Sequence, residues 1–377
     1  MALVVGACSA APKAGLEGSR PPAPRASAAP AAGASTFAAP AAPSSTSSPA
    51  PTAVAYLKGQ THVHTNRSYD AHTPPDKVLE FYAERGYDFL VVTDHNRVTD
   101  AGPGPRGMLT FPGIEVTQNS TICEPKPSPG YRCLFHASGL FVDPARDRAR
   151  GERMTLAFRP GRFDAYQSEL SLVDGLGGVG VLNHPLFHFA ADARLLGALA
   201  AQGLRHVELW NASLDRQHPA GREDAERRAE ELWDQALSND VRIFAMATDD
   251  AHHFADAADR ARVGKFAYVG DRAWVMVRAE KNPAAIRAAL ERGDYYSSTG
   301  VRLTRVERAR GTLVIEVAPE TRGSRIRIVG RGGRELQRLS GTSASYALGP
   351  NDGYARGVVE DDSGKRAWTQ PVFPDGS

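Results

Sequence analysis

Cysteine is scarce in this chain of 377 residues, which has only Cys8, Cys123 and Cys133. None of the three belongs to a Cys-x-x-Cys pair, so the sequence suggests neither a thiolate zinc site nor a dithiol redox motif. The sequence also lacks an apolar run of the length that a membrane-spanning helix requires, which is about 20 residues. Chemistry based on thiols and a transmembrane helix are therefore not expected.

The chain also lacks a strong net charge. Its 45 Lys and Arg residues nearly balance its 43 Asp and Glu residues, and the formal net charge is +2. This balance provides no strong field for a polyanion, so binding of a nucleic-acid polymer is not indicated. Glycine-rich stretches occur at residues 175–180 and 330–333, but neither matches a phosphate-binding loop that leads into a helix. Nucleotide-binding folds are thus not supported.

The amino-terminal residues predict the location of the protein. Residues 2–8 are small residues that lead into Cys8, and they resemble the end of a bacterial lipoprotein signal, although the basic start and longer apolar core are missing. Residues 9–54 are dominated by Ala, Pro, Ser and Gly, which predicts a disordered linker. We expect residues 1–55 to be a signal-like start and linker, with a lipid anchor at Cys8. This favours an extracytoplasmic location, periplasmic or on the outer surface, while a cytoplasmic location stays open.

What the chain does contain is a series of His, Asp and Glu residues directly after short apolar runs. His62 and His64 open the series, and because alternate side chains of a strand point the same way, both imidazoles can reach one ion. Apolar runs at 89–93, 108–114, 178–182 and 241–248 then end in Asp94 and His95, in Glu115, in Asn183 and His184, and in Asp249, Asp250 and His252. Potential metal ligands therefore collect at the carboxyl ends of predicted strands.

Helical patterns alternate with these strands. Residues 73–76 start one helix with two prolines, and Gly86 ends it. Further helices are predicted at 221–237 and at 283–291, the latter closed by Gly293. This alternation indicates a parallel sheet. If such a sheet closes into a barrel, the loops after its strands meet at one mouth, where the scattered side chains can converge.

These motifs resemble those of the polymerase and histidinol phosphatase (PHP) family of metal-dependent phosphoesterases. The resemblance covers about residues 62 to 300 and rests on His62-Val63-His64-Thr65 with Asp70, Thr93-Asp94-His95-Asn96, Gly113-Ile114-Glu115, Asn183-His184-Pro185 and Asp250-Ala251-His252. Within the family, residues 272–274 and 295–300 are most similar to the branch that includes carbaryl hydrolase-like enzymes. The resemblance implies a distorted seven-stranded, TIM-like βα barrel that holds two or three divalent metal ions.

The family pattern also implies which residues bind the metals. One ion would be held by His62, His64, Glu115 and Asp250, a second by Glu115, His184 and His136, and a third by Asp70, His95 and His252. The context of His136 lacks a sharp motif, and Asp250 is preferred to Asp249 only by the Asp-x-His spacing. Asp94, Asp249 and Asn183 are expected to orient the ligands. Mixed imidazole and carboxylate ligands suit Zn, Mn and Fe alike.

Several polar residues near these motifs have more than one interpretation. Glu208 and Asn211 either line the pocket or cap the next helix, and Arg67 and Arg97 either hold a phosphate oxygen or are simply solvated. Cys123 and Cys133 flank a Pro-rich loop and either form a disulfide, as an oxidising compartment would allow, or stay reduced. The histidines without motif support are expected to be structural or surface residues: His72, His188, His206, His218 and His253.

The balance of charge at the predicted site favours an anionic substrate. Asp70, Glu115 and Asp250 bring three negative charges, and two or three divalent ions bring four or six positive charges, so the site stays net positive. We therefore expect a metal-dependent phosphoesterase in which a metal-bound hydroxide attacks a small anionic phosphate ester. The alternatives are a hydrolase of carbamates or carboxylic esters and a non-catalytic metal-binding protein of the cell envelope.

From about residue 301 the pattern changes to short alternating segments separated by Gly, Asp and Asn. This predicts an all-β module, a small sandwich at residues 301–377 that either packs against the barrel or binds a polymer or partner. The expected fold class is thus α/β: a disordered amino-terminal segment, a βα barrel at 56–300 and a carboxy-terminal β module.

Overall fold

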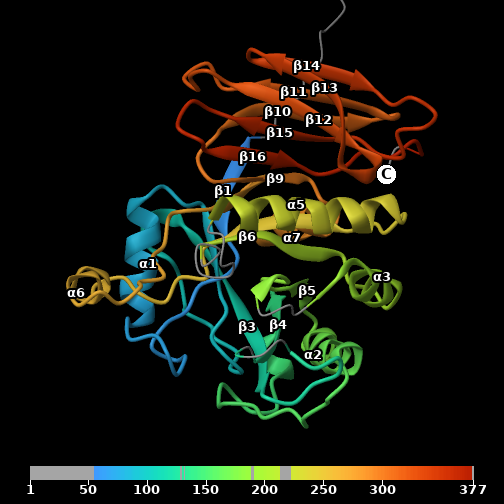
Figure 1. Cartoon of the computed structure of the whole chain (residues 1–377). Helices are drawn as coiled ribbons and strands as arrows, with labels where there is room; N and C mark the ends of the chain where they lie inside the picture. Colours follow the sequence, from blue (N-terminus) through green and yellow to red (C-terminus); the bar gives the residue numbers. More distant parts are fainter. Residues whose placement is uncertain (1–54, 128–129, 131, 188–190, 213–221, 376–377) are drawn as a thin grey trace, which may run out of the picture. The chain divides into compact units, whose positions relative to one another are not determined.

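The computed structural model describes residues 55–127, 130, 132–187, 191–212 and 222–375. The predicted disordered linker and the predicted lipid anchor at Cys8 lie outside the described residues, as do His188 and His218. Within the described part, no helix has both the length and the apolar character that crossing a bilayer requires. The described residues form a mixed α/β structure with one large sheet (Figure 1).

Most of the strands belong to a 13-stranded sheet with the order β13-β12-β15-β16-β9-β8-β1-β2-β3-β4-β5-β6-β7, and β10, β11 and β14 form a separate three-stranded sheet. In chain order the strands are β1 (Tyr56–Gln60), β2 (Phe89–Val92), β3 (Leu109–Ser120), β4 (Cys133–Leu140), β5 (Val179–Leu182), β6 (His206–Asn211), β7 (Phe244–Thr248), β8 (Trp274–Arg278), β9 (Tyr295–Ser298), β10 (Leu303–Ala309), β11 (Thr312–Val317), β12 (Arg325–Gly330), β13 (Arg334–Ser340), β14 (Ser343–Ala347), β15 (Arg356–Glu360) and β16 (Arg366–Thr369).

The strands that carry the predicted ligands are parallel with one exception. Strands β1, β2 and β3 pair in parallel, as do β5, β6 and β7. Strand β4 lies between β3 and β5 and runs antiparallel to both (Figure 1). The predicted parallel sheet is thus interrupted at β4. The described residues between β3 and β4 contain no helix, and consecutive strands that lack a crossover helix pair antiparallel.

The helices begin and end where the sequence signals lie. Helix α1 starts at Pro75 and ends just before Gly86, which adopts a φ of +71° that glycine tolerates best. In α7 the side chain of Asn282 accepts a hydrogen bond from the Ala285 amide and so caps the first turn. The helices are α1 (Pro75–Glu84), α2 (Arg162–Gly175), α3 (Ala193–Ala201), α5 (Arg222–Ser238), α6 (Ala257–Arg262) and α7 (Pro283–Glu291), with short 3₁₀ turns at Pro105–Gly107, Pro144–Arg146 and Arg331–Gly333.

The apolar face of α1 shows how the core positions these elements. Val78, Leu79 and Tyr82 are buried on this face and belong to one cluster with Leu90 and Val92 of β2. Burial of each aliphatic side chain contributes about 1.5–3 kcal/mol. This packing fixes the carboxyl end of β2, where Asp94 and His95 follow.

A disulfide joins Cys123 to Cys133, with the two Cα atoms 6.1 Å apart. It brackets the connection between β3 and β4, and both cysteines are buried. Of the two interpretations of these cysteines, the structure therefore contains the bridge. It ties the ends of the two strands that carry Glu115 and His136.

The carboxy-terminal strands form two sheets with a shared core. Leu313 and Ile315 of β11 lie in the same buried cluster as Ile326 and Ile328 of β12, although β11 and β12 belong to different sheets. A core shared by two sheets is what a β-sandwich requires, and the sandwich itself stays a prediction. The large sheet continues from β9 directly into β16, and the division of the chain at residue 300 stays a prediction.

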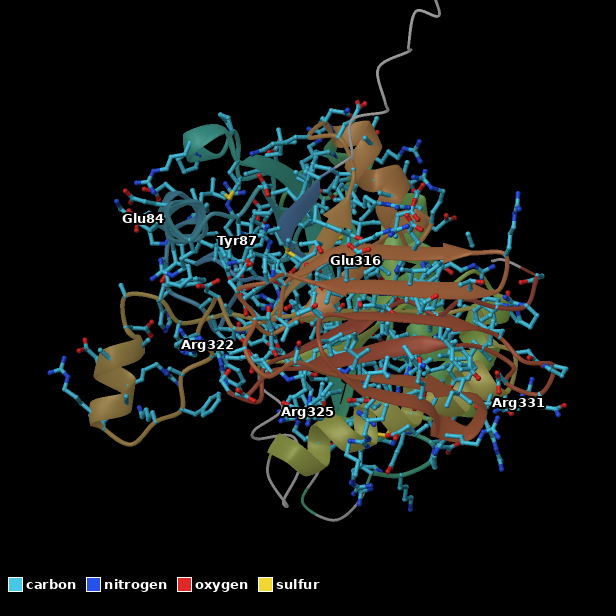
Figure 2. The ribbon with its side chains drawn as sticks, turned by 90° about the horizontal axis from the view of Figure 1, so that it is seen from above. Glu84, Tyr87, Glu316, Arg322, Arg325 and Arg331 are labelled. Carbon is cyan, nitrogen blue, oxygen red and sulfur yellow. A yellow bond between two sulfur atoms is a disulfide. The ribbon has the colours of Figure 1, made fainter. Side chains whose placement is uncertain are left out.

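Charged side chains of both signs occupy the surface of these strands (Figure 2). Arg325 pairs with Glu360 at 2.8 Å, and Arg331 pairs with Asp240 at 3.2 Å. Such exposed ion pairs contribute about 0–1 kcal/mol each. They neutralise one another locally and do not determine the fold.

Candidate metal centre

All of the predicted ligands meet at the carboxyl ends of the parallel strands. Each is within 3.6 Å of another member of the group, and all but Asp70 are buried. The group consists of His62, His64, Asp70, His95, Glu115, His136, His184, Asp250 and His252. The sequence segments that supply it range from residue 62 to residue 252, so the fold alone assembles the cluster.

His62 and His64 approach each other through their Nε2 atoms, which lie 3.1 Å apart. The Oδ1 atom of Asp250 lies 3.3 Å from the first of these nitrogens and 3.1 Å from the second. These three side chains form one buried group in which ligand atoms lie within 4.8 Å of one another. A single cation can therefore contact all three.

Hydrogen bonds at the opposite ring nitrogens fix which nitrogen of each imidazole faces the cluster. The Nδ1 atom of His62 lies 2.6 Å from Oε1 of Glu208. An ionised carboxylate has no proton to donate, so Glu208 accepts this hydrogen bond. The Nδ1 atom of His64 lies 2.9 Å from Oγ of Ser68, and this hydroxyl donates its own proton to Asp94 at 3.0 Å. Both imidazoles therefore donate from Nδ1, and their Nε2 atoms face the cluster.

Glu115 lies at the centre of the remaining histidines. Its Oε1 atom lies 3.0 Å from Nδ1 of His136 and 3.4 Å from Nε2 of His184, and its Oε2 atom lies 2.7 Å from Nδ1 of His95. Burial would raise the pKa of Glu115, but His95, His62 and His136 hold it well below its usual range. An ionised carboxylate with histidines beside both oxygens could supply ligand atoms to a divalent metal.

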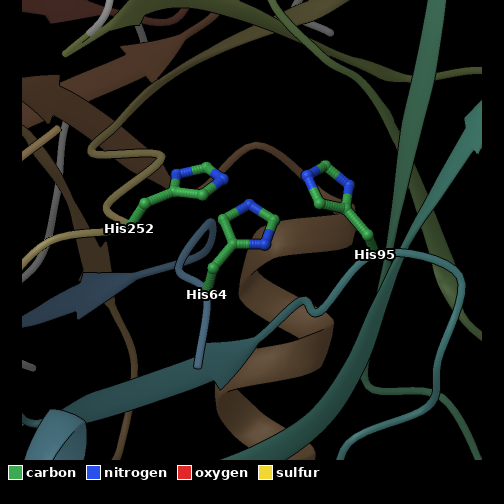
Figure 3. A group of neighbouring side chains, drawn as sticks. All are labelled: His64, His95 and His252. Carbon is green, nitrogen blue, oxygen red and sulfur yellow. The ribbon is translucent and has the colours of Figure 1, made fainter. Parts of the chain in front are cut away.

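A third group combines His64, His95 and His252 (Figure 3). The rings of His64 and His252 stack with centroids 4.0 Å apart, and Asp70 Oδ2 lies 3.4 Å from His95 Nε2 and 3.5 Å from His252 Nε2. The Nδ1 atom of His252 lies 2.9 Å from the carbonyl oxygen of Asp250, so Nε2 faces the other side chains. His64 belongs to two of the three groups, and so does His95. The assignment of each histidine to one ion therefore stays a prediction.

The charges of the cluster perturb its imidazoles in opposite directions. Burial, with help from His252 and His95, lowers the pKa of His64 to about 3. Burial would also lower the pKa of His95, but the carboxylates of Glu115 and Asp70 raise it to about 10. Protons and divalent cations therefore compete for the same nitrogens, since a metal ligand must be deprotonated.

The backbone is strained at two of the ligands. His184 has a φ of +26° and Asp250 a φ of +50°, both in the left-handed region that residues other than glycine rarely adopt. The amide of His184 donates to Glu208 Oε2 at 2.7 Å, and the amide of Asp250 donates to the carbonyl of His62 at 3.0 Å. These bonds hold the chain in conformations that turn both side chains toward the cluster.

The residues expected to orient the ligands divide into two kinds. Asn183 donates to Glu115 Oε1 at 2.8 Å, and Asp94 acts on His64 through Ser68. Asp249 instead accepts hydrogen bonds from the Tyr82 hydroxyl and from the amides of residues 271–273, which anchors the segment before β8. Burial raises the pKa of Asp249 to about 6 against these bonds. Asp250 thus lies in the cluster, and Asp249 supports the neighbouring loop.

Glu208 and Asn211 form hydrogen bonds with members of the cluster. Glu208 holds His62, and Asn211 donates from Nδ2 to Glu208 Oε2 at 3.0 Å and to Asp250 Oδ2 at 3.2 Å. The register of β6 against β7 shifts between Glu208 and Trp210, a bulge that redirects the side chains at the strand end.

A cavity of about 390 Å³ opens onto the cluster. Besides the ligands, its lining includes Tyr69, Asn119, Leu134, Phe187, His253, Arg260 and Tyr268. None of these residues has a predicted role in the site, and His253 is among the histidines expected to be structural or surface residues. Most of them lie in loops, where neither periodicity nor a strand end marks a position.

The other polar candidates lie outside this cavity. Arg67 is exposed and bonds to the carbonyl of Asp100 at 3.4 Å, and Arg97 pairs with Glu152 at 3.5 Å. His72 is exposed. His206 is buried with Nδ1 3.1 Å from the Tyr295 hydroxyl, and burial lowers its pKa to about 3, as befits a structural histidine.

No family model matches the chain, and no curated protein matches it in sequence. Solved structures similar to it include a two-domain protein from Bacteroides vulgatus that contains a predicted PHP-like metal-dependent phosphoesterase, with 16% identity, 81% of this chain and 90% of that chain covered, and a TM-score of 0.43. A suggested metal-dependent phosphoesterase from Bifidobacterium adolescentis is 18% identical, with 52% and 87% covered and a TM-score of 0.37. An amidohydrolase from Chromobacterium violaceum with bound sulfate and no metal is 15% identical, with 52% and 88% covered and a TM-score of 0.33. Likeness of this degree carries no weight for function, which has to be inferred from the site.

Proposed function

We propose that this protein is a metal-dependent hydrolase of the PHP type, similar to the carbaryl hydrolase-like branch, that cleaves phosphate esters. The observation that carries the proposal is the convergence of the His62 and His64 Nε2 atoms, 3.1 Å apart, beside the carboxylate of Asp250. Two such nitrogens repel each other unless a cation or a proton lies between them. The cluster around them holds more imidazole nitrogens and carboxylate oxygens than one proton can bridge, and these are groups that divalent metals bind.

The donor set fits two or three divalent ions. It combines imidazole nitrogens with the carboxylates of Asp70, Glu115 and Asp250, a mixture that suits Zn, Mn and Fe. Its imidazoles are oriented by buried acceptors, Glu208 for His62 and Ser68 for His64. Histidines that bind a metal through one ring nitrogen commonly donate the N–H of the other nitrogen to an ordered acceptor of this kind.

A barrel would explain why the ligands converge, and we propose that β1 to β7 form the distorted seven-stranded ring implied by the family resemblance. Support comes from the contact between the first and last of these strands. Val63, just after β1, forms a parallel bridge with Ala251, just after β7, and the amide of His64 donates to the carbonyl of Ala251 at 2.9 Å. In such a ring the loops after the strands share one mouth.

The charge at this mouth favours an anionic ester. Asp70, Glu115 and Asp250 contribute three formal negative charges, so two or three divalent ions leave a net charge between +1 and +3. When bound, such ions would lower the pKa of a coordinated water from about 15.7 toward about 7 and polarise the ester, which is the chemistry needed for hydrolysis. The protein's own contribution is to orient the imidazoles through Glu208, Ser68 and Asp94 and to enclose the substrate in the cavity.

Hydrolysis of a carbamate or carboxylic ester is the second candidate. The cavity lining contains Tyr69, Leu134, Phe187 and Tyr268, which would also accept an apolar, uncharged ester. Both candidates use the same metal centre and differ in the charge of the group attacked.

The proposal is tested by metal analysis of the purified protein, followed by rates on p-nitrophenyl phosphate, bis(p-nitrophenyl) phosphate and 1-naphthyl N-methylcarbamate. We expect at least two divalent ions per chain and turnover of a phosphate ester. The double variant His64→Ala, Asp250→Ala should lose both, while the exposed His72→Ala serves as a matched control. Phosphate-ester turnover that survives the double substitution would refute the mechanism, and turnover of the carbamate alone would favour the second candidate.

We further propose that the protein acts outside the cytoplasm and is anchored by a lipid at Cys8. The disulfide between Cys123 and Cys133 supports this, because such bridges persist mainly in oxidising compartments. Fractionation of cells that express the chain and its Cys8→Ser variant tests the anchor. Equal recovery of both proteins in the soluble fraction would contradict it.

A further inference from the structure

The segment between β7 and β8 forms one wall of the cavity. His253, Arg260 and Tyr268 of this segment all line it, and Arg260 lies on α6. Two hydrogen bonds of side chains help to hold the segment together: the Arg260 Nε donates to the carbonyl of Phe266 at 3.0 Å, and the Tyr268 amide donates to His253 Nδ1 at 3.1 Å. The amides of His252 and His253 also donate to the Tyr268 carbonyl, both at 2.9 Å. The wall is therefore organised by bonds within the segment.

Arg260 differs in charge from the rest of the lining. Among the described residues that line the cavity, it is the side chain with a permanent positive charge, and the others are neutral groups, acids and imidazoles. Its neighbour His253 accepts a hydrogen bond from the Tyr268 amide at Nδ1, so a neutral His253 carries its proton on Nε2. The wall thus offers donors to the same cavity that the metal-ligand cluster lines.

The hydrogen bond of Arg260 sets what its guanidinium can do. Because Nε is engaged with the Phe266 carbonyl, the planar head is held in orientation while its two terminal nitrogens remain as donors. A guanidinium presents such a pair of donors in the geometry that suits phosphate oxygens, and charge-assisted bonds of this kind are stronger than neutral ones.

We propose that Arg260 is a specificity-determining residue that binds the non-bridging oxygens of an anionic ester in this cavity. This inference rests on the proposed function and deepens it, since Arg260 would select phosphate esters over uncharged carbamates and carboxylic esters. An uncharged ester lacks the oxygen anions that the guanidinium recognises, so the residue contributes little to its binding.

Other arginines near the mouth do not meet the same conditions. Arg153 lies 5.0 Å from the ring centroid of Tyr69, and Tyr69 itself is 52% exposed. Arg67 and Arg97 bond to Asp100 and Glu152 and do not line the cavity.

The test compares Arg260→Gln and Arg260→Lys with Arg262→Gln. Arg262 is exposed on the same helix, pairs with Asp259 and lies outside the cavity lining, which makes it a matched control. Each variant is loaded with the metal found in the purified wild type, and its thermal melting is recorded to show that it is folded. The direct readout is binding of inorganic phosphate, measured by titration calorimetry.

Loss of a charge-assisted hydrogen bond should weaken phosphate binding about 10- to 100-fold in Arg260→Gln. Arg260→Lys should lie between this variant and the wild type, because it keeps the charge without the paired donors, and Arg262→Gln should stay within about twofold. In kinetics, Arg260→Gln should lower the ratio of kcat/KM for p-nitrophenyl phosphate to that for p-nitrophenyl acetate by a similar factor.

The inference and the proposed function fail in different ways. Phosphate binding that is equal in the wild type and a folded Arg260→Gln, or absent from the wild type, overturns the inference. A wild type that binds phosphate through Arg260 but hydrolyses no phosphate ester keeps the inference and refutes the proposed function. Equal weakening by Arg260→Gln and Arg262→Gln would show a general charge effect and would also overturn the inference.

Discussion

Glu208 offers a sharp test of how the metal centre is organised, because its carboxylate is fully used. Its Oε1 accepts from His62 Nδ1 at 2.6 Å and from the Thr248 hydroxyl at 2.7 Å. Its Oε2 accepts from the His184 amide at 2.7 Å and from Asn211 Nδ2 at 3.0 Å. In Glu208→Gln one of these oxygens becomes an NH₂ group, which is a donor and faces two donors in either orientation.

The expected cost follows from these contacts. If the new NH₂ group faces His62, the imidazole must move its proton to Nε2, and the lone pair that faces the cluster is lost. If it faces His184, the strained backbone at that ligand loses its acceptor. Changes behind metal-ligating histidines typically weaken metal affinity 10- to 100-fold, or about 1.4–2.7 kcal/mol.

The assay is competition between the protein and a chromophoric chelator for Zn²⁺ or Mn²⁺, with thermal melting recorded beside it. Glu226→Gln is the matched control, since Glu226 is also buried and accepts a bond from Trp210 Nε1 at 2.9 Å, but contacts no ligand. Glu208→Gln should weaken metal binding at least tenfold more than Glu226→Gln. Equal affinities in the two variants would show that Glu208 does not orient His62 as argued.

Three further predictions concern the stability of the fold. Asp234→Ala should lower the free energy of unfolding in urea by about 3–5 kcal/mol, because it leaves the guanidinium of buried Arg356 without the carboxylate that it contacts at 2.7 Å; a loss below 1 kcal/mol would contradict this. Burial raises the pKa of Glu169 well above its usual range, so its contribution to stability is present below about pH 4.3 and is lost as pH rises through the raised pKa. Glu169→Gln should therefore gain stability over the wild type progressively from pH 5 to pH 8, and a pH-independent difference in melting temperature would be evidence against it. Replacing Cys123 and Cys133 by serine should cost about 2.5–3 kcal/mol, as expected for a cross-link between residues 10 apart, and unchanged unfolding in denaturant would argue against the bridge.

The sequence predicted which side chains meet after the parallel strands, because there a local signal coincides with a topological rule. Apolar runs mark β2, β5 and β7, and His95, His184 and Asp250 come directly after the ends of these runs. Parallel strands place their carboxyl ends at one edge, so residues far apart in the chain meet there. No long-range information was needed to find them.

Glu115 and His136 show where this rule ends. The sequence placed Glu115 after a strand, whereas β3 continues through it to Ser120, and His136 lies within β4. Because β4 is antiparallel, its amino-terminal half lies at the edge where the cluster gathers, and a cluster residue there follows no strand end. The motif at His136 was weak for this physical reason.

The walls of the cavity were beyond prediction for a different reason. Arg260, His253 and Tyr268 are placed by hydrogen bonds within one irregular segment, such as that from Arg260 Nε to the Phe266 carbonyl. No periodic pattern encodes such bonds, so the substrate-facing residues can be identified only once the loop has a structure.

Left-handed backbone conformations occur at three positions beside the cluster. After His95 the chain turns through a left-handed φ of +54° at Asn96, a residue that tolerates this region and that also bonds to Thr117 through both side-chain atoms. His184 and Asp250 occupy the same region, and Asp and His also enter it more often than most residues other than glycine. Glycine would adopt this conformation at lower cost at both positions but would remove a cluster side chain. The residue types at these two positions therefore combine tolerance of the backbone conformation with a side chain that faces the cluster.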